Sequence, residues 1–175
     1  MRKLRTTELN RLSAKEMKNV MRLPITIVLD NVRSAYNVGS VFRTCDAFVI
    51  EKVYLCGITA YPPNRELMKT ALGSTDSIPW EHFVTGKEAL LQLKSSGYKI
   101  ILVEQTDESI SIEKFSSKPG EKYALVFGNE VDGVSDELLP LADAAIEIPQ
   151  FGTKHSFNIS VSAGIVLWDF HLKMT

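Results

Sequence analysis

Cysteine and histidine are scarce in this sequence of 175 residues. The two cysteines, Cys45 and Cys56, lie inside apolar segments and form no CxxC pair. Such cysteines are typical of reduced core residues in a cytosolic protein, so neither a disulfide framework nor a zinc site is favoured, and we expect a cytoplasmic protein. The three histidines, His82, His155 and His171, are scattered along the chain, and we therefore expect no metal site.

Long hydrophobic runs are missing as well. No apolar run approaches the roughly 20 residues that a membrane-spanning helix needs. The N-terminus is basic but lacks the apolar segment of a secretory signal. We therefore expect no contact with membranes. The length fits one domain that is large enough to bury a hydrophobic core.

Three common functional motifs are also absent. The sequence contains no GxGxxG or GxxxxGK[ST] loop, so it supports neither a Rossmann dinucleotide site nor a P-loop. No GxSxG elbow is present either. Ser156 follows His155 directly, but adjacent side chains project differently and rarely form a nucleophile–base pair. A serine hydrolase is therefore disfavoured.

Charge is nearly balanced overall but uneven along the chain. The net charge of −1 argues against a protein that coats nucleic acid nonspecifically. Residues 1–22 hold seven basic and two acidic side chains, a net charge of +5 that leaves −6 for the remainder. We predict that this segment is helical. A solvated amphipathic helix and an arm that contacts phosphates explain its charge equally well.

Past this segment, short apolar runs alternate with stretches of helical periodicity. The runs predicted as strands are 24–30, 52–56, 98–104, 123–128 and 144–149. The predicted helices are 37–48, 86–97, a short one near 135–141 and a last one near 158–172, whose first residues also alternate like a strand. This order predicts an α/β domain with a mainly parallel sheet.

In such sheets, ligands bind beyond the C-terminal ends of the strands, and the segment after strand 24–30 is polar there. Either Ser34 or Asn37 can cap the following helix. Gly39 is either a tight packing point or a gap that leaves room for a ligand beside Arg43.

Three further polar segments follow strands. Gly128 and Gly133 supply turns after strand 123–128, but turn chemistry does not explain Glu130 between them. Another polar segment, 103–107, lies at the end of strand 98–104. The segment 148–160 carries more polar side chains than a turn needs: Thr153, His155, Ser156 and Asn158, next to Gly152.

Together these segments resemble the SpoU (TrmH-type) family of RNA ribose 2′-O-methyltransferases, within the SPOUT superfamily. Three motifs match in order over about residues 24 to 170. They are N-x-G-x-x-x-R at Asn37, Gly39 and Arg43, F-G-N-E-x-x-G at Phe127 to Gly133, and I-P-x-x-G-x-x-x-S-x-N-x-S-V at Ile148 to Val161.

The resemblance implies that residues 23–175 form one SpoU-type domain, an α/β knot with a mainly parallel sheet and a C-terminal trefoil knot. It also implies S-adenosylmethionine bound in the knot, tRNA or rRNA as substrate, and a homodimer with the active site near the subunit interface. Gly152 would bend the chain sharply in the knot. The catalytic set carried over by position is Asn37, Arg43, Glu130, Ser156 and Asn158. The cofactor would lie against Glu104, Gly128, Ile148 and Phe157.

The chemistry limits what Arg43 can do, because a guanidinium stays protonated in proteins and is a poor base. We expect Arg43 to clamp the adjacent RNA phosphate, with the proton passing to water, to the phosphate or to a network with Glu130. The alternative function is a non-catalytic RNA-binding or assembly factor on the same fold. Base methylation is disfavoured, because the three motifs are the ribose-type set.

Overall fold

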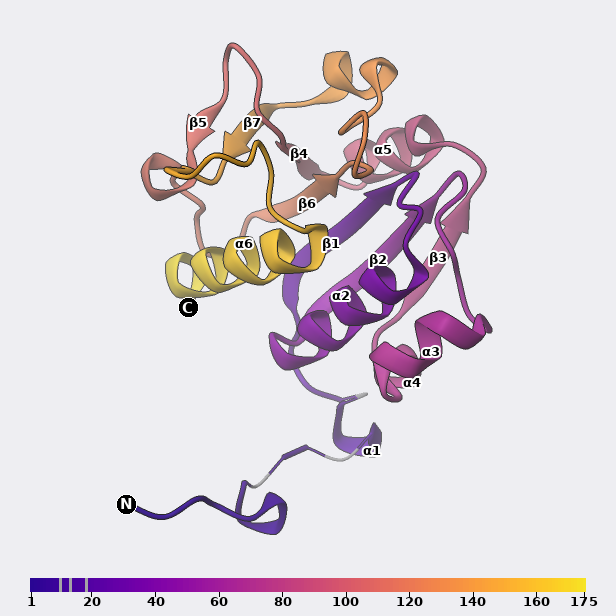
Figure 1. Ribbon diagram of the computed structural model, residues 1–175, viewed down its shortest axis with the longest axis vertical. Coiled ribbons are helices and arrows are strands. Elements are labelled where there is room, and N and C mark those ends of the chain that lie inside the picture. Colours follow the sequence, from indigo (N-terminus) through magenta and orange to yellow (C-terminus); the bar gives the residue numbers. More distant parts are fainter. Residues whose placement is uncertain (10, 13, 18) are drawn as a thin grey trace.

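A seven-stranded sheet, parallel throughout, forms the centre of the molecule (Figure 1). The computed structural model describes residues 1–9, 11–12, 14–17 and 19–175. The strands are β1 (Leu23–Asp30), β2 (Ile50–Cys56), β3 (Trp80–Phe83), β4 (Tyr98–Val103), β5 (Ile110–Ser111), β6 (Lys122–Phe127) and β7 (Ala144–Glu147), in the order β3-β2-β1-β6-β4-β7-β5. The predicted α/β class with a mainly parallel sheet is confirmed, whereas the trefoil knot stays a prediction.

Helices cover both faces of this sheet, in the layers that a parallel sheet requires. The α-helices of the domain are α2 (Ala35–Ala47), α3 (Arg65–Ala71), α4 (Ser74–Ser77), α5 (Gly86–Ser95) and α6 (Ile159–Met174), and the 3₁₀ turns are η2 (Ile112–Lys114) and η3 (Asp136–Leu141). Residues of α2, α3 and α6 form one hydrophobic cluster with the sheet, and residues of α5 and η3 form the other.

Strand β1 shows why the strands of this sheet are apolar almost without interruption. Ile27 belongs to the cluster under α2 and α6, while its neighbour Val28 belongs to the cluster under α5. Both side chains are fully buried. Because successive side chains of a strand point to opposite faces, burial on both faces favours apolar residues along the strand, and Thr26 and Asp30 are the buried polar exceptions in β1. Cys45 and Cys56 are free and buried, as predicted, and burial raises the pKa of the Cys56 thiol to about 12.

The helix α2 settles two of the questions that the sequence left open. Ser34 is its N-cap, with a side-chain oxygen that accepts a hydrogen bond from the backbone N–H of Asn37 at 3.3 Å. A Cβ on Gly39 would lie 2.2 Å from the carbonyl oxygen of Leu67 in α3. The space beside Gly39 is therefore filled by a neighbouring helix, which favours the packing interpretation over the ligand one.

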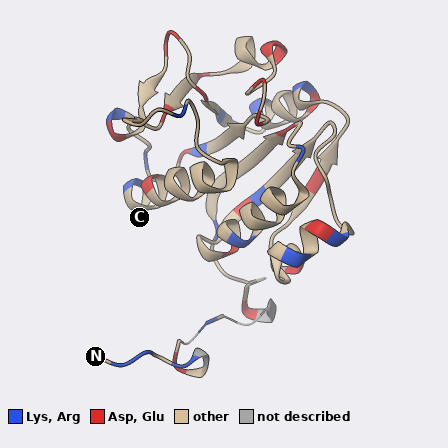
Figure 2. Ribbon diagram, in the orientation of Figure 1, with Lys and Arg blue, Asp and Glu red and all other residues tan. Residues whose placement is uncertain are grey.

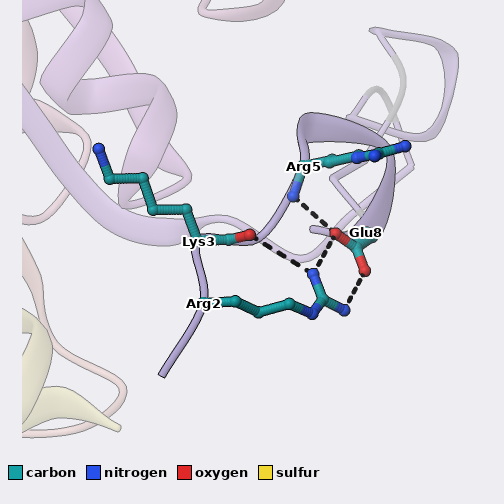
Figure 3. A network of polar contacts seen from close by, with 4 residues as sticks. All are labelled: Arg2, Lys3, Arg5 and Glu8. Carbon is teal, nitrogen blue, oxygen red and sulfur yellow. Dashed lines mark hydrogen bonds and ion pairs between the residues drawn. The ribbon is translucent and has the colours of Figure 1, made fainter.

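The N-terminal segment extends away from the domain and holds two short helical turns, η1 (Thr6–Glu8) and α1 (Ala14–Met17) (Figure 1). Residues 10, 13 and 18 lie outside the described residues, so a helix through the whole segment stays a prediction. Figure 3 shows that the Arg2 guanidinium meets both carboxylate oxygens of Glu8, at 2.6 and 2.9 Å. The carboxylate also accepts the Arg5 N–H at 2.7 Å, and these contacts hold the pKa of Glu8 below its ordinary value.

Arg22 fixes the point at which this segment joins the domain. Its guanidinium donates to the carbonyl oxygens of Met17 and Ile50, each at 3.1 Å, and of Ser77 at 2.8 Å. These three carbonyls come from the segment, the start of β2 and the end of α4. One basic residue of the segment is therefore structural, while Lys3, Arg5 and Arg11 are exposed. Figure 2 shows the blue of Lys and Arg along this N-terminal extension.

Candidate active site

A cavity of about 490 Å³ opens at the C-terminal ends of β4, β6 and β7. This volume lies within the range of small-molecule sites, roughly 300 to 1,000 Å³. The cavity sits where parallel α/β sheets bind their ligands. Its lining comes from the residues that end these strands, from the connection between β6 and η3, and from the connection between β7 and α6.

All four residues predicted to contact the cofactor line this cavity. Glu104 follows β4, Gly128 follows β6 and Ile148 follows β7, while Phe157 precedes α6. The apolar part of the lining consists of Val103, Phe127, Val131, Ile146, Ile148, Phe157 and Ile159. The lining thus joins apolar walls, which suit a planar ring, to polar groups at the ends of the strands.

Three of the five predicted catalytic residues also line the cavity, namely Glu130, Ser156 and Asn158. Asn37 joins them through hydrogen bonds. Its Nδ2 donates to Oε1 of Glu130 at 3.1 Å, and its Oδ1 accepts from Nδ2 of Asn158 at 3.2 Å. One amide therefore links the three motifs, which are up to 121 residues apart along the chain.

Asn158 has a second task, because it is the N-cap of α6. Its Oδ1 accepts from the backbone N–H of Ser160 at 2.9 Å and from the Ser160 hydroxyl at 2.7 Å. The cap fixes the side chain, so that its Nδ2 is left to face Asn37. The helix start, ambiguous in the sequence, is set by this cap.

Arg43 is not brought to the cavity within one chain. It lies on α2 six residues after Asn37, so that a helix of 3.6 residues per turn points the two side chains about 120° apart. The side chain is exposed, and within the described residues it has no hydrogen bond or ion pair. Its catalytic role stays a prediction.

The charge of the cavity is strongly one-sided. Four carboxylate residues line it: Glu104, Glu130, Asp132 and Glu147. Among the described lining residues there is neither lysine nor arginine, and His155 is the sole histidine. Walls of one sign concentrate field and attract the opposite charge. The lining therefore favours a ligand that carries a positive charge.

Two carboxylates hold the loop 128–135 in place; Glu104 was predicted only as a cofactor contact, and Asp30 was not predicted. Oε2 of Glu104 accepts the backbone N–H of Val134 at 3.0 Å, and the buried Asp30 accepts that of Ser135 at 2.9 Å. A Cβ on Gly133, whose φ is +72°, would lie 2.2 Å from the same Glu104 oxygen. In the sequence, an acid at the C-terminal end of a buried strand was the available signal.

The connection between β7 and α6 is closed at its base by two glutamine side chains. Nε2 of Gln105 and Nε2 of Gln150 donate to the carbonyl oxygen of His155, at 3.1 and 3.2 Å. Gly152 has no left-handed φ, and a Cβ there would meet nothing within 4 Å. The backbone does bend at Gly152 and Thr153, as expected, but the bend does not require a glycine.

Within the described ranges, no helix combines the length and apolar character that crossing a membrane requires. Over the same part of the chain, no group of three or more His, Cys, Asp or Glu side chains is placed to hold a metal ion.

Comparison with known proteins identifies relatives over almost the whole chain. The model of the SpoU rRNA Methylase family matches residues 24–168. A 23S rRNA (guanosine-2′-O-)-methyltransferase of Neisseria meningitidis is 30% identical over 86% of this chain and 59% of its own length. A tRNA (guanosine(18)-2′-O)-methyltransferase of Thermus thermophilus is 30% identical over 93% of this chain and 82% of its own length.

Solved structures support the same family assignment. The Aquifex aeolicus TrmH/SpoU tRNA modifying enzyme superposes with a TM-score of 0.80 at 28% identity, over 91% of this chain and 81% of that one. An AdoMet-bound rRNA methyltransferase from Sinorhizobium meliloti gives a TM-score of 0.80 at 25% identity, over 89% of this chain and 59% of that one. The resemblance seen in the three motifs is confirmed, and the chain belongs to the SpoU rRNA methylase family.

Proposed function

We propose that this chain is an S-adenosylmethionine-dependent methyltransferase that methylates a ribose 2′-hydroxyl in tRNA or rRNA. The observation that carries the proposal is the hydrogen-bonded set Glu130–Asn37–Asn158 at a cavity of cofactor size. The names of the relatives support it, since they methylate guanosine ribose in 23S rRNA or tRNA.

The residues of the cavity fit the cofactor. Apolar residues such as Ile148 and Phe157 offer walls for an adenine ring, and the carboxylate lining offers acceptors and negative charge. When bound, S-adenosylmethionine supplies an electrophilic methyl group on a positively charged sulfur. An acidic cavity without lysine or arginine among its described lining residues suits that charge.

The chain contributes alignment and control of one proton. The ribose 2′-oxygen takes the methyl group and gives up its hydrogen, so it must be held in line with the donor. Ser156 and Asn158 lie at the cavity and would orient the ribose. Glu130, held by Asn37, offers a carboxylate oxygen through which the proton could pass to water.

Arg43 would act on the RNA rather than on the cofactor. As a permanent cation it cannot remove the proton, but it can bind the phosphate next to the reacting ribose and stabilise developing negative charge on the 2′-oxygen. Its exposure on α2 leaves it available to a second molecule.

A homodimer would supply what one chain lacks. The apolar side chains of Val161, Trp168 and Leu172 are about half exposed on α6, at a spacing of seven and four residues that places them on one face. This face adjoins α2, through the contact of Phe48 with Trp168. A second copy packed there would cover the apolar side chains and bring Arg43 to the partner's cavity.

A non-catalytic RNA-binding factor on the same fold is the alternative, and the intact network around Asn37 favours catalysis over it. The two buried, free cysteines favour a reducing compartment, and we place the protein in the cytoplasm.

The experiment that tests the function is transfer of radiolabelled methyl from S-adenosylmethionine into total RNA lacking the modification, followed by digestion and nucleoside analysis. We expect a labelled 2′-O-methylnucleoside, and the RNA fraction that carries it identifies tRNA or rRNA. Label on a base would overturn the assigned chemistry, and absence of label despite cofactor binding would favour the non-catalytic alternative.

A further inference from the structure

We propose that Phe151 is an RNA-binding residue whose ring stacks on a nucleobase of the RNA at the mouth of the cavity. The inference rests on the proposed function, and it adds a contact to the base where the proposed catalytic set addresses the ribose and phosphate.

The position of Phe151 is the first observation. Its neighbour Gln150 lines the cavity, as do His155 and Ser156 on the other side of the same short loop. Phe151 itself does not line the cavity, and 97% of its surface is exposed. The ring thus stands at the rim, a few residues from the serine expected to hold the reacting ribose.

The loop that carries the ring is closed at its base. The side chains of Gln105 and Gln150 both donate to the His155 carbonyl, so that residues 151–154 form a short projection tied at one point. A ring on such a projection loses little further freedom on binding. At 97% exposure the phenyl ring adds no burial to the fold, so both of its faces are free to stack on a bound molecule.

The charge around the ring indicates what that molecule is. The cavity below is lined by four carboxylate residues, whereas residues 151–154, which do not line the cavity, include Lys154 and no acidic residue. The sign of the charge therefore changes from the cavity to its rim. A polyanion is kept out of the cavity but attracted to the rim, next to the ring.

A second copy of the chain suits this loop less well than RNA does. The sequence neighbours of Phe151 are Gln150, Gly152, Thr153 and Lys154, so its loop presents no second apolar side chain of the kind that gathers at the centre of a subunit interface. An aromatic ring beside a cation among polar groups is instead the usual arrangement for binding an unstacked RNA base.

The test compares two substitutions at this position with a matched control. Phe151→Leu removes the aromatic face and keeps an apolar side chain, whereas Phe151→Trp enlarges the face. Tyr61→Leu is the control, because Tyr61 is half exposed and contacts β3, at the edge of the sheet away from β4 and β7. Methyl transfer, the Kd of S-adenosylmethionine and the oligomeric state are measured for each.

We expect Phe151→Leu to raise KM for RNA about tenfold, as loss of one stacked base does, with the Kd of S-adenosylmethionine unchanged. Phe151→Trp should keep KM at or below the wild-type value, and Tyr61→Leu should leave it near the wild-type value. An unchanged KM in Phe151→Leu would overturn the stacking role. The proposed function would still stand in that case, provided that the wild type transfers methyl groups. A dimer weakened by Phe151→Leu would overturn it in favour of a subunit contact.

A fluorescence measurement keeps the inference testable without turnover. The emission added by Phe151→Trp, taken as the difference from the wild type with its Trp80 and Trp168, should be quenched by RNA through stacking. Unquenched emission under conditions where the RNA is bound would overturn the stacking role. If the wild type transfers no methyl group but quenching occurs, the proposed function fails and the contact to RNA stands.

Discussion

The cavity and the outer face of α2 and α6 differ in how far a single chain completes them. In the cavity, the side chains of Glu104 and Glu130 are already held by hydrogen bonds. On the outer face, Arg43 is exposed, and so are Trp168 and Leu172. The half of the site that faces the cofactor is thus assembled in advance, while the half that we assign to RNA depends on a second molecule.

Removing the Arg43 side chain should separate these halves most sharply. We expect Arg43→Ala to lower kcat by about 10²- to 10³-fold, the usual loss when a group that stabilises the transition state is deleted. Calorimetric binding of S-adenosylmethionine should not change, because Arg43 does not line the cavity. Arg65→Ala, which removes another exposed arginine on α3, is the control. Near-normal turnover in Arg43→Ala would refute the role.

The next largest effect is expected from a charge placed on the outer face. Trp168→Glu puts a carboxylate into the apolar stripe of α6, so we expect light scattering to show a monomer. A desolvated unpaired charge opposes association. Without a partner, Arg43 no longer reaches a cavity, so turnover should fall by about tenfold or more. The monomer should still bind S-adenosylmethionine. A fully active monomer would show that the cavity and Arg43 cooperate within one chain.

A smaller effect distinguishes the two tasks of Asn158. Asn158→Ala should lower the free energy of unfolding by about 1 kcal/mol through loss of the helix cap, and should also lower turnover. Asn158→Ser keeps a capping oxygen but cannot reach Asn37 with an amide. We therefore expect serine to restore stability in denaturant titrations without restoring turnover. Equal turnover in the serine variant and the wild type would deny the network a catalytic role.

The smallest effect concerns the N-terminal segment. Deleting residues 1–20 removes the exposed cations Lys3, Arg5 and Arg11 and leaves Arg22 in place. If the segment contacts phosphates, RNA affinity should fall several-fold, and the slope of log K against log salt should decrease by about 1 to 2. An unchanged slope would show that the segment is a solvated structure rather than an RNA-binding arm.

Much of the fold could be predicted because the buried strands are unambiguous. Strands β1, β2, β4, β6 and β7 and helices α2, α5 and α6 all lie where the apolar pattern places them. Strand β3 was missed because it is four residues long, half buried and polar at Glu81 and His82. The two-residue strand β5 and the short helices α3 and α4 carry too few residues for a period to be recognised.

The site was predictable in its residue types rather than in its connections. The motifs identified Asn37, Glu130 and Asn158, and the structure joins them. The bonds from Glu104 and Asp30 to backbone N–H groups could not be predicted, since they depend on how the loop 128–135 folds back between two strand ends. That Arg43 does not line the cavity also became clear only from the three-dimensional structure, because it depends on where α2 lies relative to the strand ends.

The hydrogen bonds of Asn37 give the network a direction. The amide donates to Glu130 and accepts from Asn158, so hydrogens run one way from Asn158 through Asn37 to a carboxylate that has none to give. Asn37→Asp alone would set two carboxylates against each other. Combined with Glu130→Gln, the same substitution restores a donor opposite an acceptor and reverses the first link, while Asn158 still donates to the second. One link of the network can thus be inverted while the other keeps its direction, but only the native pair leaves a carboxylate at the cavity to receive a proton.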